Sequence, residues 1–307
     1  MSKIQASIDI GSNSILLLVG EFKDGVFERY ESESRVTSLG LNLDQTKKFD
    51  EQSMADSYDA LSEYKEIVKK YNIDPRKIIT TATEASRVAQ NAKNFYSKVS
   101  SELNINVQII TSEAEAYYSA KGILFDSDFK KEKVFILDIG GASSEIIEVN
   151  TKTKEIINSF SMPFGAVRAT NWTQKETVDE EFDKVFSGFS DELASSKTDN
   201  LYCVAGTMTS VANISLGTPS FDEVKVHGFK MTSLDVVSIY ERLKLLSDEE
   251  ILKQYPFLAR RSKTIVGGLR VATTIFKWLR VKNIEISTYG LRYGTILEGR
   301  IKDEHLA

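Results

Sequence analysis

Two short segments share one pattern: an apolar run that ends in aspartate, a turn of small residues, and hydroxyl side chains. They read IDIGSNS at residues 8–14 and LDIGGASSE at residues 137–145. In a strand, turn and returning strand, glycine lets the backbone approach an anion, and successive N–H groups can converge on it. One copy is also typical of a plain hairpin, but a second copy about one domain length away predicts a pair of phosphate-binding loops. The residues assigned to phosphate binding in these loops are Ser12, Asn13, Ser14, Gly140, Gly141, Ala142, Ser143 and Ser144.

The aspartate that ends each apolar run, Asp9 or Asp138, is a candidate metal ligand. Mg²⁺ is usually held by one or two carboxylates together with phosphate oxygens, so Mg²⁺ or Mn²⁺ is the expected cofactor. A cluster of histidine and cysteine ligands is not expected, because the chain has two histidines and one cysteine. The cysteine, Cys203, is expected to be a small buried core residue.

Two glutamates near these patterns could take part in hydrolysis. Glu115 lies in the first turn of the helix that ITSEAEA opens, where a carboxylate could deprotonate a water molecule if the two loops face a cleft. The competing interpretation is a capping box formed by Ser112 and Glu115, which needs no chemistry. Glu145 begins the return strand of the second pattern, as either an edge residue or a cleft residue.

Three further places along the chain could bind phosphate. Arg87 follows a predicted strand-to-helix turn, and Arg168 lies in PFGAVR. Either guanidinium could bind phosphate with two hydrogen bonds or form a surface salt bridge. Gly206 and Thr207 end a strand and begin a helix, where the helix dipole favours an anion.

The elements that must position these residues follow an α/β order. In the first half, helices over 50–71, 84–103 and 112–124 alternate with strands over 77–83 and 106–110, which is typical of parallel strand pairs. Segment 37–46 is predicted to be a loop, and the polar segment 125–132 is the predicted domain boundary. The second half repeats the plan with a hairpin, helices over 178–195, 208–216, 234–246, 248–255, 264–279 and 293–302, and strands over 201–205 and 284–288.

At 307 residues, 27% of them charged and 41% hydrophobic, the chain is long enough for about two domains that each bury a core. The net charge of −5 argues against a nucleic-acid binder, and no apolar run approaches the roughly 18 residues of a membrane helix. The first residues carry no signal-like segment, so a cytoplasmic location is expected. Eight basic and no acidic residues lie within 251–284, either as a polyanion-binding surface or as a solvated helix face.

Seven motifs, in their order and spacing, resemble the family of exopolyphosphatases and guanosine pentaphosphate phosphohydrolases. They are IDIGSNS (8–14), TATEASR (81–87), TSEAEA (111–116), LDIGGASSE (137–145), PFGAVR (163–168), VAGTMTS (204–210) and YGLRYG (289–294). The resemblance implies an α/β fold of two ribonuclease-H-like domains, in the group of actin, Hsp70 and sugar kinases, with the active site in the cleft between them. The expected domains are 1–125 with 293–307, and 126–292.

The resemblance also implies roles for individual residues. The family's catalytic glutamate falls on Glu115, the glutamate that closes its glycine-rich loop falls on Glu145, and its phosphate-binding arginine falls on Arg87. The implied reaction is Mg²⁺-assisted hydrolysis of a terminal phosphoanhydride of polyphosphate or guanosine pentaphosphate, with Glu115 activating water. The expected partner is a small or polyanionic phosphate substrate, and a homodimer is allowed; neither nucleic acid nor a membrane is expected.

Several positions depart from the family pattern. Ala114, Tyr117, Ala142, Ala205 and Tyr293 stand where the pattern has glutamate, arginine, glycine, glycine and glutamate. Alanine in place of glycine could reshape a loop where φ is positive. The chain resembles short members of the family that lack a C-terminal His-Asp-type domain. A weakly active sensor of guanosine polyphosphates or nucleotides, and an ATP-dependent kinase of the same fold group, are the alternative functions.

Overall fold

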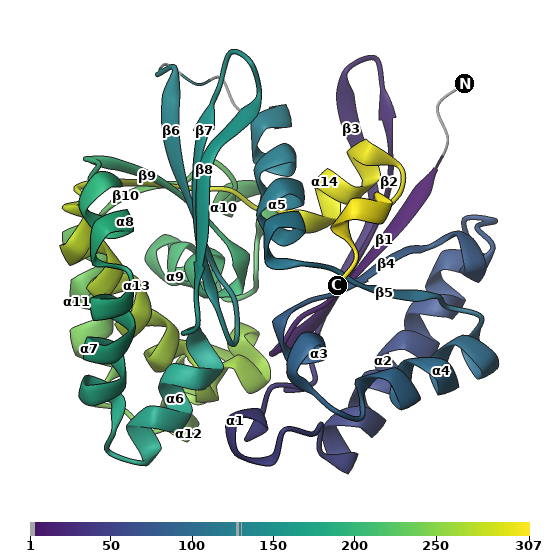
Figure 1. Cartoon of the computed structure of the whole chain (residues 1–307), viewed down its shortest axis with the longest axis horizontal. Coiled ribbons are helices and arrows are strands. Elements are labelled where there is room, and N and C mark those ends of the chain that lie inside the picture. The colour runs from purple at the N-terminus through teal and green to yellow at the C-terminus, as the bar shows by residue number, and fades with distance from the viewer. Residues whose placement is uncertain (1–3, 127–128, 130) are drawn as a thin grey trace. The chain divides into compact units, whose positions relative to one another are not determined.

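The computed structural model describes residues 4–126, 129 and 131–307, and the chain divides into two compact units. Unit 1 comprises Met1–Phe125 and Leu291–Ala307, and unit 2 comprises Asp126–Gly290. Residues 127, 128 and 130 of the predicted linker lie outside the described residues. Each unit contains a mixed sheet with helices (Figure 1), so the predicted α/β class is confirmed. Within the described part, no helix is both long and apolar enough to cross a membrane.

The sheet of unit 1 has the strand order β3-β2-β1-β4-β5. The first three strands form an antiparallel meander, and β1, β4 and β5 run parallel. The strands are β1 Gln5–Ile10, β2 Ser14–Lys23, β3 Val26–Val36, β4 Ile79–Ala82 and β5 Val107–Ile109. The helices are α1 Leu43–Thr46, α2 Glu51–Lys69, α3 Glu84–Val88, α4 Ala92–Leu103, α5 Ser112–Asp126 and α14 Leu291–Glu298, with 3-10 turns η1 Pro75–Lys77 and η3 Asp303–His305.

The sheet of unit 2 has the order β10-β11-β9-β6-β7-β8, so it repeats the same plan with one added edge strand. Here β6, β7 and β8 form the meander, and β6, β9 and β11 run parallel. The strands are β6 Lys133–Ile139, β7 Ser144–Asn150, β8 Glu155–Met162, β9 Asn200–Val204, β10 Lys230–Thr232 and β11 Asn283–Ile286. The helices are α6 Ala166–Gln174, α7 Val178–Gly188, α8 Ser190–Ser195, α9 Ala205–Leu216, α10 Glu223–Val226, α11 Ser233–Leu243, α12 Asp248–Gln254 and α13 Ile265–Leu279, with the 3-10 segment η2 Pro256–Lys263.

Alternation along β1 decides which of its side chains enter the main core of unit 1. Ile8 and Ile10 pack in the cluster that also contains residues of α2 and α4. Ser7 points to the opposite face, where its hydroxyl lies 2.7 Å from the hydroxyl of Thr295 in α14. Because side chains alternate along a strand, Asp9 lies on the same face as Ser7. The opposite face packs on the core that includes α2 and α4.

Two predicted helices are each interrupted. The predicted helix over 84–103 divides into α3 and α4, because Ala89 is extended and the side chain of Asn91 binds the backbone of Phe49. The predicted helix over 178–195 divides into α7 and α8 at Phe189, whose ring stacks on Phe160 of β8. Strand β8 is absent from the predicted elements, because most of its side chains are exposed or half-buried. The predicted loop 37–46 contains the short helix α1.

Helix α14 crosses α5 at a very short distance. A Cβ atom at Gly294 would lie 1.8 Å from the carbonyl oxygen of Tyr118. The side chain of Tyr118 is fully buried, so the α5 backbone cannot move aside without disturbing the core. This crossing therefore requires glycine.

We expect Gly294→Ala to lower the free energy of unfolding by about 3 kcal/mol, because overpacking against backbone cannot be relieved by a side-chain rotation. Urea-induced unfolding followed by circular dichroism measures this. The matched control is Gly188→Ala at the end of α7, where a Cβ atom would meet nothing within 4 Å. In this variant the free energy of unfolding should rise by about 0.5 kcal/mol. Equal stability of the two variants would contradict the close crossing.

Candidate active site

The two D-I-G-x-x-S segments form the same turn. In unit 1 the N–H of Gly11 donates to the carbonyl of Ser14, and in unit 2 the N–H of Gly140 donates to the carbonyl of Ser143, both at 3.0 Å. A Cβ atom at either glycine would lie 3.2 Å from that same carbonyl oxygen. The repeated sequence pattern thus corresponds to a repeated backbone geometry.

The N-terminus of α6 binds the carbonyl groups of the loop in unit 2. The N–H of Ala166 donates to the carbonyl of Gly140 at 2.9 Å, and the next two N–H groups of the helix donate to the carbonyl of Gly141 at 2.8 and 3.2 Å. The C=O and N–H of a trans peptide point in opposite directions. The N–H groups of Gly141 and Ala142 therefore point away from α6.

Arg168 extends this arrangement by one peptide. Its Nη1 donates to the carbonyls of Ala142 and Pro163, each at 2.8 Å. The N–H of Ser143 consequently points away from Arg168, so three successive N–H groups, those of residues 141–143, point away from the donors that bind the loop carbonyls. Arg168 is 9% exposed and binds carbonyl groups, so the predicted alternative of a surface salt bridge is wrong. Its contacts support the loop from behind.

Gly165 allows α6 to approach the loop so closely. A Cβ atom at this position would lie 2.6 Å from the carbonyl oxygen of Gly140 and 2.8 Å from the backbone nitrogen of Ala142. Gly165 was within the PFGAVR motif but is not among the predicted site residues. The signal that could have identified it is a glycine directly before a helix that must touch another backbone.

In unit 1 the segment 37–40 binds the carbonyl groups of the loop, as α6 does in unit 2. The carbonyl of Ser12 accepts from the N–H of Gly40 at 2.7 Å, and the carbonyl of Asn13 accepts from two N–H groups of residues 37 and 38, each at 3.0 Å. By the same peptide geometry, the N–H of Asn13 points away from the 37–40 segment. Both loops thus have carbonyl groups that are bound from the protein side.

The second loop is followed by a buried carboxylate. Asp138 in β6 and Glu145 in β7 are directly opposite each other in the antiparallel pair, so they share one face of the sheet. Glu145 is 1% exposed, and its Oε1 accepts a hydrogen bond of 2.7 Å from Ser161 of β8. Since β7 is paired on both sides, the predicted alternative that Glu145 is an edge residue is wrong. The hydroxyl of Ser144 donates to the carbonyl of Phe164 at 2.7 Å and so serves the packing of the loop.

In unit 1, Arg87 joins two carboxylates at the carboxyl ends of β4 and β5. Its Nη2 lies 3.1 Å from Oε2 of Glu84 and 3.2 Å from Oε2 of Glu115, and its Nη1 donates to the carbonyl of Ile110 at 2.6 Å. Burial alone would lower the pKa of Arg87, but the carboxylates of Glu115 and Glu84 raise that pKa above its ordinary value. The predicted neighbours Arg87 and Glu115 are thus brought together, with Glu84 as an additional member.

Glu115 does not form the predicted capping box. Thr111 occupies the capping position instead, because its hydroxyl accepts from the N–H of Ala114 at 3.1 Å and its carbonyl from the N–H of Glu115 at 3.0 Å. Ser112 is already the first residue of α5. The capping interpretation of Glu115 is therefore wrong, and its carboxylate binds Arg87.

The third predicted loop, at Gly206 and Thr207, begins α9 beside a buried arginine. A Cβ atom at Gly206 would lie 2.6 Å from a guanidinium nitrogen of Arg261, whose Nη1 also donates to Ser210 at 3.2 Å. Burial lowers the pKa of Arg261 to about 10. Thr207 packs against Gly268 of α13. A positive charge therefore lies directly against this helix start.

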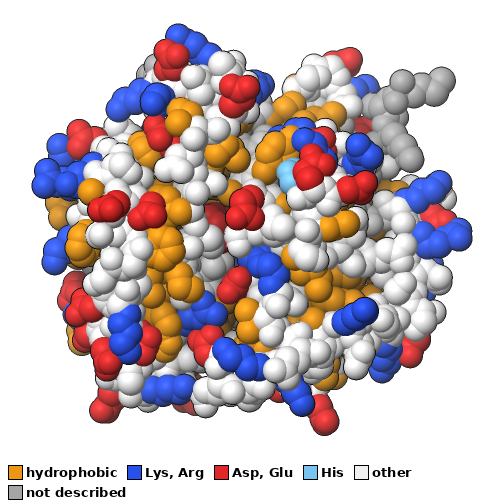
Figure 2. All heavy atoms as spheres, viewed as in Figure 1, with side chains coloured by type: hydrophobic (Ala, Val, Ile, Leu, Met, Phe, Trp, Pro, Cys, Tyr) orange, Lys and Arg blue, Asp and Glu red, His pale blue; other side chains and the backbone are white. Residues whose placement is uncertain are grey.

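At least three of the eight basic residues within 251–284 contact other groups of the chain. Arg261 points inward, Arg270 pairs with Asp179, and Lys282 pairs with Asp199 at 3.1 Å. On the face drawn in Figure 2, side chains of both charges are interspersed and do not gather by sign. Whether the remaining basic residues form a polyanion-binding surface or a solvated helix face stays a prediction.

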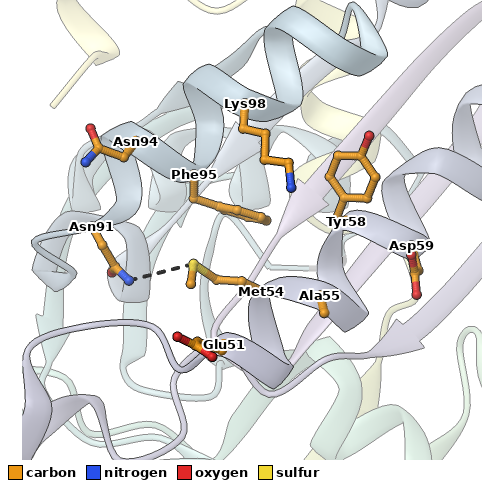
Figure 3. A pocket seen from close by; sticks show the side chains of 9 residues that line it. All are labelled: Glu51, Met54, Ala55, Tyr58, Asp59, Asn91, Asn94, Phe95 and Lys98. Carbon is orange, nitrogen blue, oxygen red and sulfur yellow. Dashed lines mark hydrogen bonds between the residues drawn. The ribbon is translucent and has the colours of Figure 1, made fainter.

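A pocket of about 460 Å³ lies between α2 and α4 of unit 1 (Figure 3), and none of the residues assigned to the site lines it. It is lined by Glu51, Met54, Ala55, Tyr58, Asp59, Asn91, Asn94, Phe95 and Lys98. The ammonium of Lys98 lies 5.1 Å from the centre of the Tyr58 ring. No carboxylate or arginine of the candidate active site contributes to this pocket.

The candidate metal ligands are single carboxylates. Asp9 and Asp138 are half-buried and lie one residue before the last residue of β1 and of β6. No group of three or more His, Cys, Asp or Glu side chains that could hold a metal occurs in the described ranges. Mg²⁺ commonly binds through one or two carboxylates, with water and phosphate oxygens completing its shell. The donor set therefore fits Mg²⁺ or Mn²⁺. Cys203 is buried as predicted, and burial raises the pKa of its thiol.

Two alanines at positions where the resemblance implies glycine differ in backbone conformation. Ala205 has a φ of 67°, in the left-handed region, whereas Ala142 is not among the described residues with positive φ. We therefore expect Ala205→Gly to raise the free energy of unfolding by about 0.5 kcal/mol, because release of left-handed strain outweighs the added freedom of the unfolded chain. In the control, Ala142→Gly, the free energy of unfolding should fall by about 0.5 kcal/mol. Urea unfolding checks both, and shifts in the same direction would refute the assignment of strain.

The sequence matches the model of the Ppx/GppA phosphatase family over residues 18–302. It is 30% identical to a bifunctional 3-dehydroquinate synthase/phosphatase of Fusobacterium nucleatum, covering 96% of this chain and 46% of the relative. It is 24% identical to exopolyphosphatase 2 of Mycobacterium tuberculosis, covering 90% of both chains. It is 26% identical to a guanosine-5'-triphosphate,3'-diphosphate pyrophosphatase of Vibrio atlanticus, covering 96% of this chain and 59% of that protein.

The chain therefore spans about half the length of the Fusobacterium and Vibrio relatives and nearly all of the mycobacterial one. The structure is similar to the crystal structure of the Aquifex aeolicus Ppx/GppA family member, with 28% identity, a TM-score of 0.75 and 97% of each chain covered. The fold class that the motifs implied is thus confirmed. This chain belongs to the Ppx/GppA phosphatase family.

Proposed function

We propose that this protein is a phosphohydrolase that releases the terminal phosphate from inorganic polyphosphate, guanosine pentaphosphate or both. One observation carries the proposal: the loop after β6 directs three successive N–H groups, those of Gly141, Ala142 and Ser143, away from the donors that bind its carbonyls. Such an array is suited to the oxygens of a phosphoryl group. The loop after β1, with the N–H of Asn13, is a second candidate for phosphate binding.

Glu115 would act as the general base. Its carboxylate is held by Arg87 and is 12% exposed, so it is fixed in direction and still accessible to a water molecule. In phosphoryl transfer the protein contributes mainly positioning and stabilisation of charge. Glu145, in unit 2, would orient a water molecule. Arg87 and the loop N–H groups would stabilise negative charge on the transferred phosphoryl group.

Asp9 in unit 1 and Asp138 in unit 2 are each proposed as a ligand of a divalent cation, which when bound would neutralise charge on phosphate oxygens. Gly206 and Thr207, at the start of α9, would bind a phosphate beside the positive charge of Arg261. The exopolyphosphatase name of the mycobacterial relative supports polyphosphate, and the name of the Vibrio relative supports guanosine pentaphosphate. We propose that the protein acts in the cytoplasm.

A second candidate function is a sensor that binds guanosine polyphosphates without turnover. The observation that favours it is the state of Arg87, whose guanidinium already binds two carboxylates and a carbonyl. Tyr117 stands where the family pattern has arginine, and its neutral hydroxyl donates to Glu298 at 3.0 Å. The positive charge of that arginine is therefore missing. The sensor predicts tight binding with no phosphate release.

We expect Glu115→Gln to reduce kcat for phosphate release by about 10²- to 10⁴-fold, because amide nitrogen and oxygen cannot accept the proton of the attacking water. The glutamine keeps an oxygen that Arg87 can bind, so the fold should be retained. Phosphate release is measured from short and long polyphosphate and from guanosine pentaphosphate, with Mg²⁺ and with a chelator.

The control is Glu113→Gln, in the same helix turn but exposed, which should leave the rate within about twofold. Release from guanosine pentaphosphate alone would narrow the substrate to that class. Equal rates for Glu115→Gln and the wild type would exclude Glu115 as the base, and no release by the wild type would favour the sensor.

A further inference from the structure

Arg87 has almost no hydrogen-bonding capacity left for phosphate. A guanidinium has five N–H groups, and in Arg87 these make four hydrogen bonds: Nε to Glu84, Nη1 to Ile110, and Nη2 to Glu84 and Glu115. Within the described part of the chain, one N–H of Nη1 therefore remains. To donate two hydrogen bonds to one phosphate, Arg87 would have to break a hydrogen bond to Glu84 or Glu115.

Glu84 is responsible for half of this occupancy. It binds both Nε, at 3.3 Å, and Nη2, at 3.1 Å, from a position three residues earlier in α3. The side chains of Glu84, Arg87 and Glu115 are 21%, 15% and 12% exposed, so the three charges interact with limited screening by water. By themselves, two carboxylates and one guanidinium carry a net charge of about −1, so Glu84 adds a negative charge that opposes the approach of a phosphate anion.

The motif around Glu84 did not identify it as a site residue, because TATEASR contributes only Arg87 to the predicted set. Arg87 could be held in place by Ile110 and Glu115 alone, since those two acceptors lie on different nitrogens. The additional carboxylate is therefore not needed to orient the guanidinium. Its effect on binding is electrostatic.

We propose that Glu84 is a specificity-determining residue that weakens the binding of a single phosphate group by Arg87. Resting on the proposed function, this assigns Glu84 the task of keeping affinity for the orthophosphate product low. Longer phosphate chains would then depend on the N–H groups of the loops for binding. The site would favour substrates with several linked phosphates over orthophosphate and phosphate monoesters.

The test uses Glu84→Gln, which removes the charge and keeps an oxygen acceptor for Arg87. Binding of inorganic orthophosphate, measured by isothermal titration calorimetry with Mg²⁺ present, should tighten about three- to tenfold, and inhibition of phosphate release by orthophosphate should strengthen by the same factor. KM for a short polyphosphate should change less than the orthophosphate affinity does, because the loop N–H groups supply most of the binding of a chain. Glu113→Gln, which removes the same charge from the exposed side of α5, should change none of these values by more than about 1.5-fold.

A double-variant cycle connects the effect to Arg87. If Glu84 acts through Arg87, the gain in orthophosphate affinity should disappear when Glu84→Gln is combined with Arg87→Gln. Unchanged orthophosphate affinity in Glu84→Gln would overturn the proposal, as would a loss of thermal stability without any change in affinity. Orthophosphate binding needs no turnover, so an inactive wild type would refute the proposed hydrolase while the role of Glu84 remains tested by calorimetry.

Discussion

The hydrogen bonds on the carbonyl side of the phosphate loops are the constraint on which the rest of the candidate site depends. When the N–H of a loop peptide points outward, its C=O points into the protein and must accept a hydrogen bond there. In unit 2 the start of α6 and the guanidinium of Arg168 supply those donors, and Gly165 permits the approach. The shape of the loop therefore depends on residues that would themselves touch no substrate.

The same plan, used twice, explains where the charged side chains occur. In each sheet the parallel strands end on the same side. The two aspartates lie in the last residues of such strands, and the arginine and glutamate cluster and the start of α9 follow strand ends. Ligands of open α/β sheets bind at the carboxyl ends of strands. The apolar residues of β1 face the large core, so Asp9 is left on the other face. In β6, Leu137 and Ile139 likewise enter the core of unit 2, which leaves Asp138 opposite them.

Much of this could be predicted from the sequence, because repetition and periodicity are local signals. The D-I-G-x-x-S pattern predicts both turns, and alternation of strands and helices predicts the α/β class. Contacts distant in sequence could not be predicted: the break before α4 arises from Asn91 binding Phe49, and Thr111 takes the capping position that Ser112 was expected to hold. The engagement of Arg87 by Glu84 depends on the register of α3, which the sequence pattern leaves open.

The most direct test of the account is a crystal structure of the Glu115→Gln variant with Mg²⁺ and imidotriphosphate, a non-hydrolysable triphosphate. We expect oxygens of the terminal phosphoryl group to accept hydrogen bonds from the N–H groups of Gly141, Ala142 and Ser143, within about 3 Å of each nitrogen. A triphosphate bound elsewhere on the protein, with these three N–H groups bound only to water, would contradict it.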